Sequence, residues 1–192
     1  MINERFSPLQ IDFAIHNPLE PRPSVLSGRQ DELIDLDSTV MNDFINRSHQ
    51  SMCNCDGSKA CVQFYRRYRS KHLVYHSLLY TKRGSSISFF IHYSEDGEPD
   101  LFGSVEVYFS CADKKYALIN HYEAKSLFTD YFVSSRYHPH LLTATNAYFH
   151  VLHRTSTHQK IVLVERIRSM CIVFHFSDSY VVTPVSSSYE HD

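Results

Sequence analysis

Residues 86–109 read SISFFIHYSEDGEPDLFGSVEVYF, and this stretch decides the fold. Apolar side chains occupy every second position on both sides of its centre, at Ile87, Phe89, Ile91 and Tyr93 and again at Val105, Val107 and Phe109. A period of two is typical of β-strands that bury one face. The central SEDGEPD is rich in turn residues. The stretch therefore predicts an antiparallel hairpin whose loop is longer than the two-residue minimum.

The same period continues through the rest of the chain. Further strand-like segments follow the pattern, namely HLVYHSLLY, KKYALINHY, AYFHVLH, KIVLVE, CIVFHF and SYVVTPV, with polar turns between them. Together with the hairpin they predict a mainly β (α+β) fold, a small antiparallel barrel or sandwich of about eight strands.

The first 60 residues have a different pattern. Four of the seven prolines lie before residue 24, which predicts an extended lead-in. Ser27 and Gln30 have the Ser-x-x-Gln spacing of a capping box, and apolar residues then recur at helical spacing. We expect an amphipathic helix over residues 28–48, and a division into an N-terminal extension (1–60) and a β-rich domain (61–192).

Composition limits the classes of protein to be considered. The formal net charge is −2, so a globally basic surface is excluded. The N-terminus lacks the apolar run of a signal peptide, and the longest aliphatic run, IVLV at 161–164, is too short for a membrane span. Five cysteines cannot all pair internally. We therefore expect an intracellular protein with free thiols and no membrane partner.

A cysteine-rich segment, CNCDGSKAC at residues 53–61, suggests a metal site. Cys53, Cys55 and Cys61, with His49 upstream, could supply the four ligands of a structural zinc ion. The Cys-x-Cys-x5-Cys spacing only half matches that of known zinc sites. A loop of reduced thiols is the alternative, and a disulfide or a catalytic thiol ranks below both.

The segment FYRRYRSKH, residues 64–72, combines basic and aromatic side chains. Residues 61–83 hold six basic residues and no acid. Such a patch is typical of nucleic-acid binding, in which cations meet phosphates and tyrosines stack on bases. The candidate contacts are Tyr65, Arg66, Arg67, Tyr68, Arg69 and Lys71. The cluster is also a candidate nuclear-localisation signal. In the alternative interpretation, Phe64 and Tyr68 anchor the segment to the core and the charges are simply solvated.

Motifs of catalysis are absent from the sequence. It has no Gly-x-Ser-x-Gly elbow, no phosphate-binding loop and no dinucleotide fingerprint, and its acidic residues are scattered. Paired histidines occur at 72/76, 138/140 and 150/153, each without an evident third metal ligand. These observations predict a protein without catalytic activity of its own.

Two regions, residues 62–123 and 161–192, resemble the C-terminal β-rich region of proteins from CACTA-type DNA transposons and their domesticated relatives. The matching positions are Phe64, Tyr65, Arg67, Tyr75, Ser77, Tyr80, Lys82, Arg83, Phe102, Gly103, Glu106, Phe109, Ala117, Leu118 and Ile119, together with the C-terminal IVLVERIRSMCIVF and YVVTPVSSSYEHD. Residues 124–145 match nothing in the family, and Met170 replaces a usual basic residue.

The resemblance implies that transposase chemistry belongs to a separate RNase H-like domain with acidic metal ligands, for which this chain has no room. The chain would then be an appended module or a remnant of a longer reading frame. We expect a non-catalytic, transposon-derived β module that contacts DNA or RNA, or chromatin. The alternatives are a protein-interaction module whose partners are other protein chains and, less favoured, a zinc-dependent enzyme.

Overall fold

The computed structural model describes residues 24–30, 38–51, 62–70, 73–80, 89–125, 133–176 and 178–185. The elements in chain order are β1 (Val25–Gln30), α2 (Thr39–Ser51), β2 (Val62–Ser70), β3 (Leu73–His76), β4 (Phe90–Glu95), β5 (Glu98–Cys111), β6 (Lys114–Lys125), α4 (His138–Tyr148), β7 (His150–Leu163), the short 3-10 helix η2 (Val164–Arg166), β8 (Ile167–Phe176) and β9 (Ser179–Pro184). The predicted mainly β architecture is confirmed.

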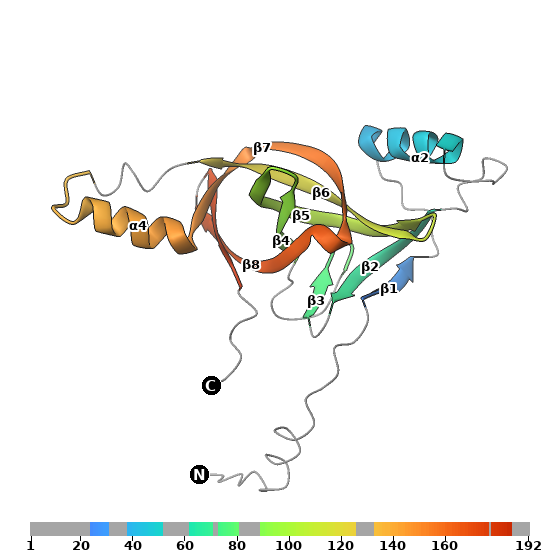
Figure 1. The fold of residues 1–192 in the computed structure, drawn as a ribbon, viewed down its shortest axis with the longest axis horizontal. Coiled ribbons are helices and arrows are strands. Elements are labelled where there is room, and N and C mark those ends of the chain that lie inside the picture. The colour runs from blue at the N-terminus through green and yellow to red at the C-terminus, as the bar shows by residue number, and fades with distance from the viewer. Residues whose placement is uncertain are drawn as a thin grey trace, which may run out of the picture.

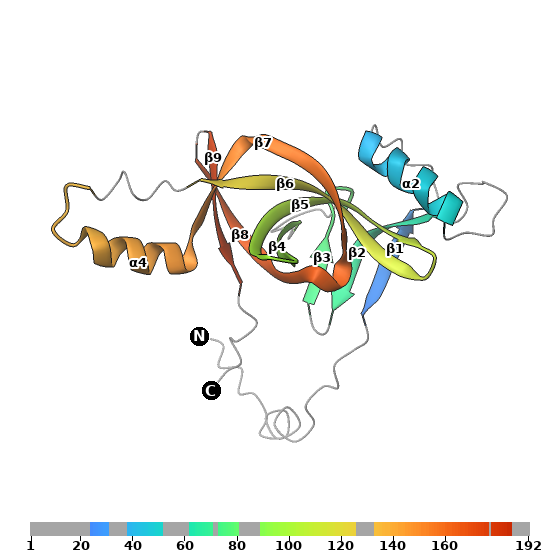
Figure 2. The ribbon, with the colours of Figure 1, turned by 45° about the horizontal axis from the view of Figure 1, so that its top comes forward.

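Six of the strands form a partial ring (Figures 1 and 2). Antiparallel pairing runs β4–β5–β6–β7–β9–β8 and returns from β8 to β4. Strand β2 extends this ring on one side, because it pairs with the end of β5 as well as with β1 and β3. Helices α2 and α4 lie at opposite ends of the molecule (Figure 1).

Three apolar clusters make up the core. The cluster to which all six ring strands contribute consists of Phe89, Phe90, Phe102, Tyr122, Leu152, Cys171, Val173, Tyr180 and Val182. A second cluster includes Tyr68 and Tyr75 of β2 and β3, which pack with residues of β4, β5 and β6. In the third, Phe44 of α2 packs edge-on against Phe109 and Tyr116. The clusters therefore connect β1–β3 and α2 to the ring.

The central hairpin differs from its prediction in two ways. Its loop is only two residues long, Asp96 and Gly97, because Glu95 already pairs with Glu98. Gly97 adopts a φ of 90°, which glycine tolerates without the strain that a Cβ would bring. A β-bulge at Glu106 also interrupts the alternation in β5. As a result Val105 packs in one cluster and Val107 in another, instead of sharing a face.

The predicted helix over residues 28–48 was wrong at its N-terminal end. Residues 28–30 belong to β1, in which Ser27 pairs with Arg67 and Gln30 with Phe64. Ser27 therefore does not cap a helix, because it lies within β1 and pairs with Arg67 of β2. The helix itself, α2, begins at Thr39, and the true cap is Ser38, whose Oγ accepts a hydrogen bond of 3.1 Å from the backbone N–H of Met41.

A polar network connects α2 to the ring. The Ser38 hydroxyl also donates a 2.7 Å hydrogen bond to the side-chain oxygen of Gln159 on β7. The amide nitrogen of Gln159 and that of Asn120 both donate to the carboxylate of Glu106, the residue at the bulge. One carboxylate thus binds donors from two neighbouring strands, and Gln159 passes the connection on to the helix cap.

Candidate nucleic-acid interface

The basic-aromatic segment folds as β2, so its side chains are distributed by the geometry of a strand. Arg67 and Arg69 are two residues apart and lie on the same side of β2, as alternate residues of a strand do. Both are half-buried. Opposite them on β1 are Ser27 and Val25, neither of which carries a charge. The strand therefore carries two arginine side chains on one face.

Both arginines have an unsatisfied donor. The Nε atoms of Arg67 and Arg69 are buried and have no hydrogen-bond partner among the described residues. Within the same part of the chain, neither arginine forms an ion pair with a carboxylate. Buried polar groups in folded proteins nearly always have a partner, so each of these two donors can take an acceptor in addition to the described protein atoms. For an arginine, the strongest such partner is an anion.

Aromatic side chains lie next to these arginines. The Arg67 guanidinium lies 5.3 Å from the centre of the Tyr80 ring, within the range of a cation–π contact. His76, which pairs with Arg67 across β2 and β3, stacks on Tyr80 at 4.3 Å with an interplanar angle of 20°. Tyr80 and His76 were not among the predicted contacts. The rings beside Arg67 thus come from β3 and the residues that follow it, outside the basic-aromatic segment 64–72.

The two predicted tyrosines have different environments. Tyr68 is only 3% exposed and packs against Tyr75 and Tyr108, so its ring is not presented for stacking on a base. Tyr65 is half-buried, and its hydroxyl donates a 2.9 Å hydrogen bond to Gln63. Tyr68 matches the alternative interpretation of the segment, that of an anchor to the core.

Two other basic residues flank the pair. Arg66 lies between Tyr65 and Arg67 on β2, and the hydroxyl of Ser77 donates to its backbone carbonyl. Arg29 on β1 is directly opposite Tyr65. The sequence interpretation missed Arg29 because it placed this residue in a helix. Lys71 lies outside the described residues.

The predicted zinc ligands also lie mainly outside the described part of the chain. Cys53, Cys55 and Cys61 are not described, and His49 falls within α2 without a described side chain. Among the described residues, no group of three or more His, Cys, Asp or Glu side chains is arranged to hold a metal ion. The zinc site therefore stays a prediction.

Two cysteines are described, Cys111 and Cys171; both are buried and neither forms a disulfide. Burial raises the pKa of Cys171 to about 12. A thiol with so high a pKa holds its proton at neutral pH and is a poor nucleophile.

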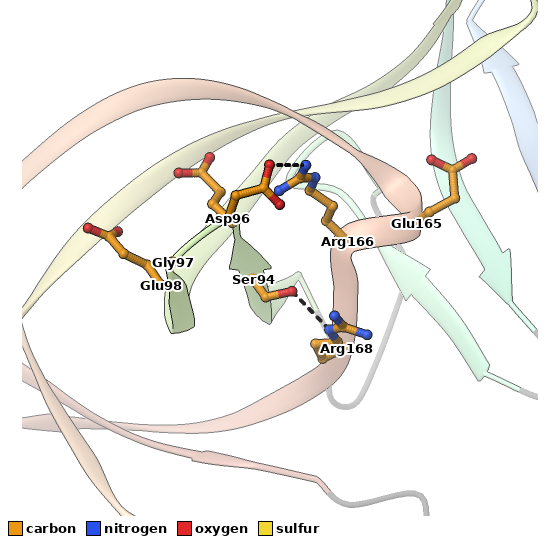
Figure 3. A pocket seen from close by; sticks show the side chains of 8 residues that line it. Ser94, Asp96, Gly97, Glu98, Glu165, Arg166 and Arg168 are labelled. Atoms are coloured by element: carbon orange, nitrogen blue, oxygen red, sulfur yellow. Dashed lines mark hydrogen bonds and ion pairs between the residues drawn. The ribbon is translucent and has the colours of Figure 1, made fainter.

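A charged depression of about 540 Å³ lies beside the β4–β5 turn (Figure 3). Glu95, Asp96, Glu98 and Glu165 surround it together with Arg166 and Arg168. Arg166 forms a 3.1 Å ion pair with Asp96, and Arg168 donates to the Ser94 hydroxyl. Glu95 is paired with Lys160 at 3.1 Å. Because several of its charges already have partners, this depression is a weaker candidate for a ligand site than the Arg67–Arg69 pair.

Comparisons with known proteins identify no relative: no family model matches the chain, and neither a curated protein nor a solved structure is similar to it. In the described part of the chain, neither helix has the length and apolar character needed to cross a membrane.

Proposed function

We propose that this chain is a non-catalytic nucleic-acid-binding module that holds the phosphate backbone with the guanidinium groups of Arg67 and Arg69. The observation that carries this proposal is that these adjacent arginines each have a buried, unpartnered Nε and no carboxylate partner within the described residues. Phosphate oxygens are the acceptors that such donors match best. In this proposal the partial ring is a small barrel that supports β1–β3.

The neighbouring rings favour a strand with accessible bases. Tyr80 lies against Arg67, and His76 stacks on Tyr80, so a guanidinium and two aromatic groups lie next to one another. Single-stranded nucleic acids bind surfaces that combine cations with aromatic platforms. We therefore infer that single-stranded DNA or RNA binds more tightly than a duplex.

The transposon resemblance suggests an origin for such a module. The matching residues include Arg67, Tyr80 and Tyr65, all at or beside the proposed site. A domesticated transposon protein that retained DNA or chromatin contact would act inside the nucleus, so we propose that location as well.

Fluorescence anisotropy with labelled single-stranded DNA, single-stranded RNA and duplex DNA tests the proposal. Arg67→Gln/Arg69→Gln removes both guanidinium groups, and Arg136→Gln/Arg168→Gln is a control with the same change in net charge. We expect the first variant to lose roughly 10- to 100-fold in affinity, the effect of removing one or two charge-assisted hydrogen bonds. The control should bind almost as the wild type does. Equal losses in both variants, or no binding by the wild type at low salt, would refute the proposal.

A further inference from the structure

Helix α4 is the one described helix without a buried residue. It spans 11 residues, His138–Tyr148, of which His138, Leu141, Leu142 and Thr145 are half-buried and the others are exposed. In both ribbon views it extends away from the ring (Figures 1 and 2). An isolated helix shorter than about 12–15 residues is marginal in water. A helix of this length therefore needs a surface that covers one of its sides.

The helix has a side suited to such a surface. Leu141, Leu142 and Tyr148 recur at the spacing that places side chains along one stripe of a helix, with Thr145 between them, and Phe149 follows in an extended conformation. Tyr148 is 66% exposed. The helix contains no Asp, Glu, Lys or Arg at all. Covering this stripe would therefore remove apolar groups from water without burying a charge.

A matching apolar surface lies on β8. Ile172, Phe174 and Phe176 are alternate residues of the strand, so they project on the same side, and they are 51%, 51% and 61% exposed. Residues 169–176 include no Asp, Glu, Lys or Arg. Three large apolar side chains in one exposed row are unusual on a monomer and often mark an interaction site. We name this row the β8 stripe.

We propose that the partner of both surfaces is a second copy of this chain: α4 of each protomer packs on the β8 stripe of the other around a two-fold axis. Both halves of the contact are present in every chain, and both are uncharged, so they match in chemistry. They also belong to the same end of the ring. Residue His150, which follows α4, pairs with Val182 of β9, and Phe174 pairs with Val181.

The area is sufficient for a weak dimer. Tyr148, Phe149, Phe174 and Phe176 are 37–66% exposed. Because an aromatic side chain presents about 150–250 Å², covering these four removes roughly 400 Å² per protomer. Ile172, Leu141 and Leu142 add to this value. The total stays below the roughly 800 Å² per partner that specific interfaces bury, so we expect a weak dimer with a dissociation constant in the micromolar range.

Sedimentation equilibrium of the full chain from about 1 µM to 1 mM, a range that spans weak affinities, tests the association. We expect the mass to rise from 22.4 kDa toward twice that value. Helicity measured by circular dichroism should rise over the same range, since α4 becomes covered. A chain that stays monomeric at the highest concentration would overturn the proposal.

Paired variants test the geometry. Tyr148→Lys disrupts the helix side, and Phe174→Glu disrupts the β8 stripe; both residues are exposed, so the fold should survive. Ala147→Lys, on the opposite side of α4, is the control and should dimerise normally. We expect each of the first two variants to weaken dimerisation at least tenfold.

Mixing the two variants distinguishes this arrangement from others. A mixed dimer retains one intact contact between Tyr148 of one copy and Phe174 of the other, so association should recover in the mixture. If α4 packed on α4, or stripe on stripe, mixing would restore nothing. If association does not recover in the mixture, the packing of α4 on the β8 stripe of the other copy is rejected. If Ala147→Lys weakens dimerisation as much as Tyr148→Lys does, the Tyr148 side of α4 is not the contact surface.

Discussion

The hydroxyl of Tyr93 on β4 and Nδ1 of His121 on β6 share a buried hydrogen bond of 2.9 Å that passes over the strand between them. That strand is β5, where Gly103 pairs with Ile91 on one side and with His121 on the other. Tyr93 itself pairs with Leu101 of β5, so its hydroxyl reaches His121 diagonally across the middle strand. The bond is thus a polar contact between two strands that are not neighbours.

Removal of the Tyr93 hydroxyl should destabilise the protein. His121 is 8% exposed, so Tyr93→Phe leaves a buried ring nitrogen without this partner. We expect a loss of about 1–3 kcal/mol in the free energy of unfolding. Urea denaturation followed by circular dichroism measures it, with Tyr137→Phe as an exposed control. A Tyr93→Phe value within error of the wild type would mean that the bond contributes nothing.

Stability should fall below neutral pH. The pKa of His121 is lowered from its ordinary value of about 6.5, chiefly because the ring is buried. The nearby Lys160 and His158 lower this pKa further, while Glu95 and Glu123 partly offset the shift. Because its pKa is lowered, His121 stays neutral in the folded protein at pH values at which the same histidine in the unfolded chain already binds a proton. Stability is therefore full above about pH 6.5 and declines below it, by at most about 1.4 kcal/mol per pH unit for one histidine.

His150 should also make stability fall as the pH decreases. Burial lowers the pKa of His150; the nearby Asp100 raises this pKa and the nearby His92 lowers it, and the net shift is downward. Unfolding measured between roughly pH 7.5 and 5.5, on either side of an ordinary histidine pKa, gives the slope. In His121→Gln the slope should be smaller than in the wild type. An unchanged slope would show that His121 is not the titrating group.

A side chain at position 103 should not be tolerated. The Cβ of an alanine there would lie 2.9 Å from the backbone oxygen of Asn120 and 3.2 Å from Cδ1 of Ile119. The nearest atom is backbone and cannot rotate away, so Gly103→Ala should cost about 1–3 kcal/mol. Thermal unfolding measures the loss. Ile119→Val in the same chain should not restore stability, since the contact with Asn120 remains; full recovery would contradict this explanation.

The capping residue Ser38 should contribute more to the stability of the protein than its neighbour Thr39. Ser38→Ala removes both the cap of α2 and the hydrogen bond to Gln159, so we expect a loss of about 1–2 kcal/mol. Thr39→Ala, at the adjacent exposed position, should change stability by less than about 0.5 kcal/mol. Chemical denaturation of the two variants compares them directly. Equal effects would mean that Ser38 is not the functional cap.

Where the sequence has a strict period of two and clear turns, the β elements could be predicted. KKYALINHY lies within β6, CIVFHF within β8 and SYVVTP forms β9. AYFHVLH and KIVLVE were expected as two strands, but they belong largely to the single long strand β7. Polar residues 154–159 look like a turn, yet β7 runs through them, and residues 157–159 pair with β6.

Ser27–Gln30 shows why local motifs can mislead. The spacing suits a capping box, but pairing with β2 supplies the hydrogen bonds of these residues, and a partner strand is invisible to a local motif. Gly28, with a φ of 70°, is the residue that tolerates this backbone conformation within β1. The bulge at Glu106 is hidden for a similar reason, since its network depends on Asn120 and Gln159 from other strands.

Helix α4 was missed because its apolar stripe is short and interrupted by polar residues. Pro139 lies in the first turn of α4, where proline fits a helix well. At the candidate site, Arg67 and Arg69 were named from the sequence as candidate contacts. His76 lies opposite Arg67 through the pairing of β2 with β3, and Tyr80 follows that strand, so a local motif could not indicate either ring.

The salt dependence of nucleic-acid affinity is the most direct test of the role proposed for Arg67 and Arg69. Each phosphate contact contributes about 0.7 to the slope of log affinity against log salt for a single strand. We expect Arg67→Gln/Arg69→Gln to lower that slope by about 1.4 relative to the wild type, and Arg136→Gln/Arg168→Gln to leave it unchanged. A slope that is the same in the wild type and in the first variant would show that these two arginines do not hold phosphate.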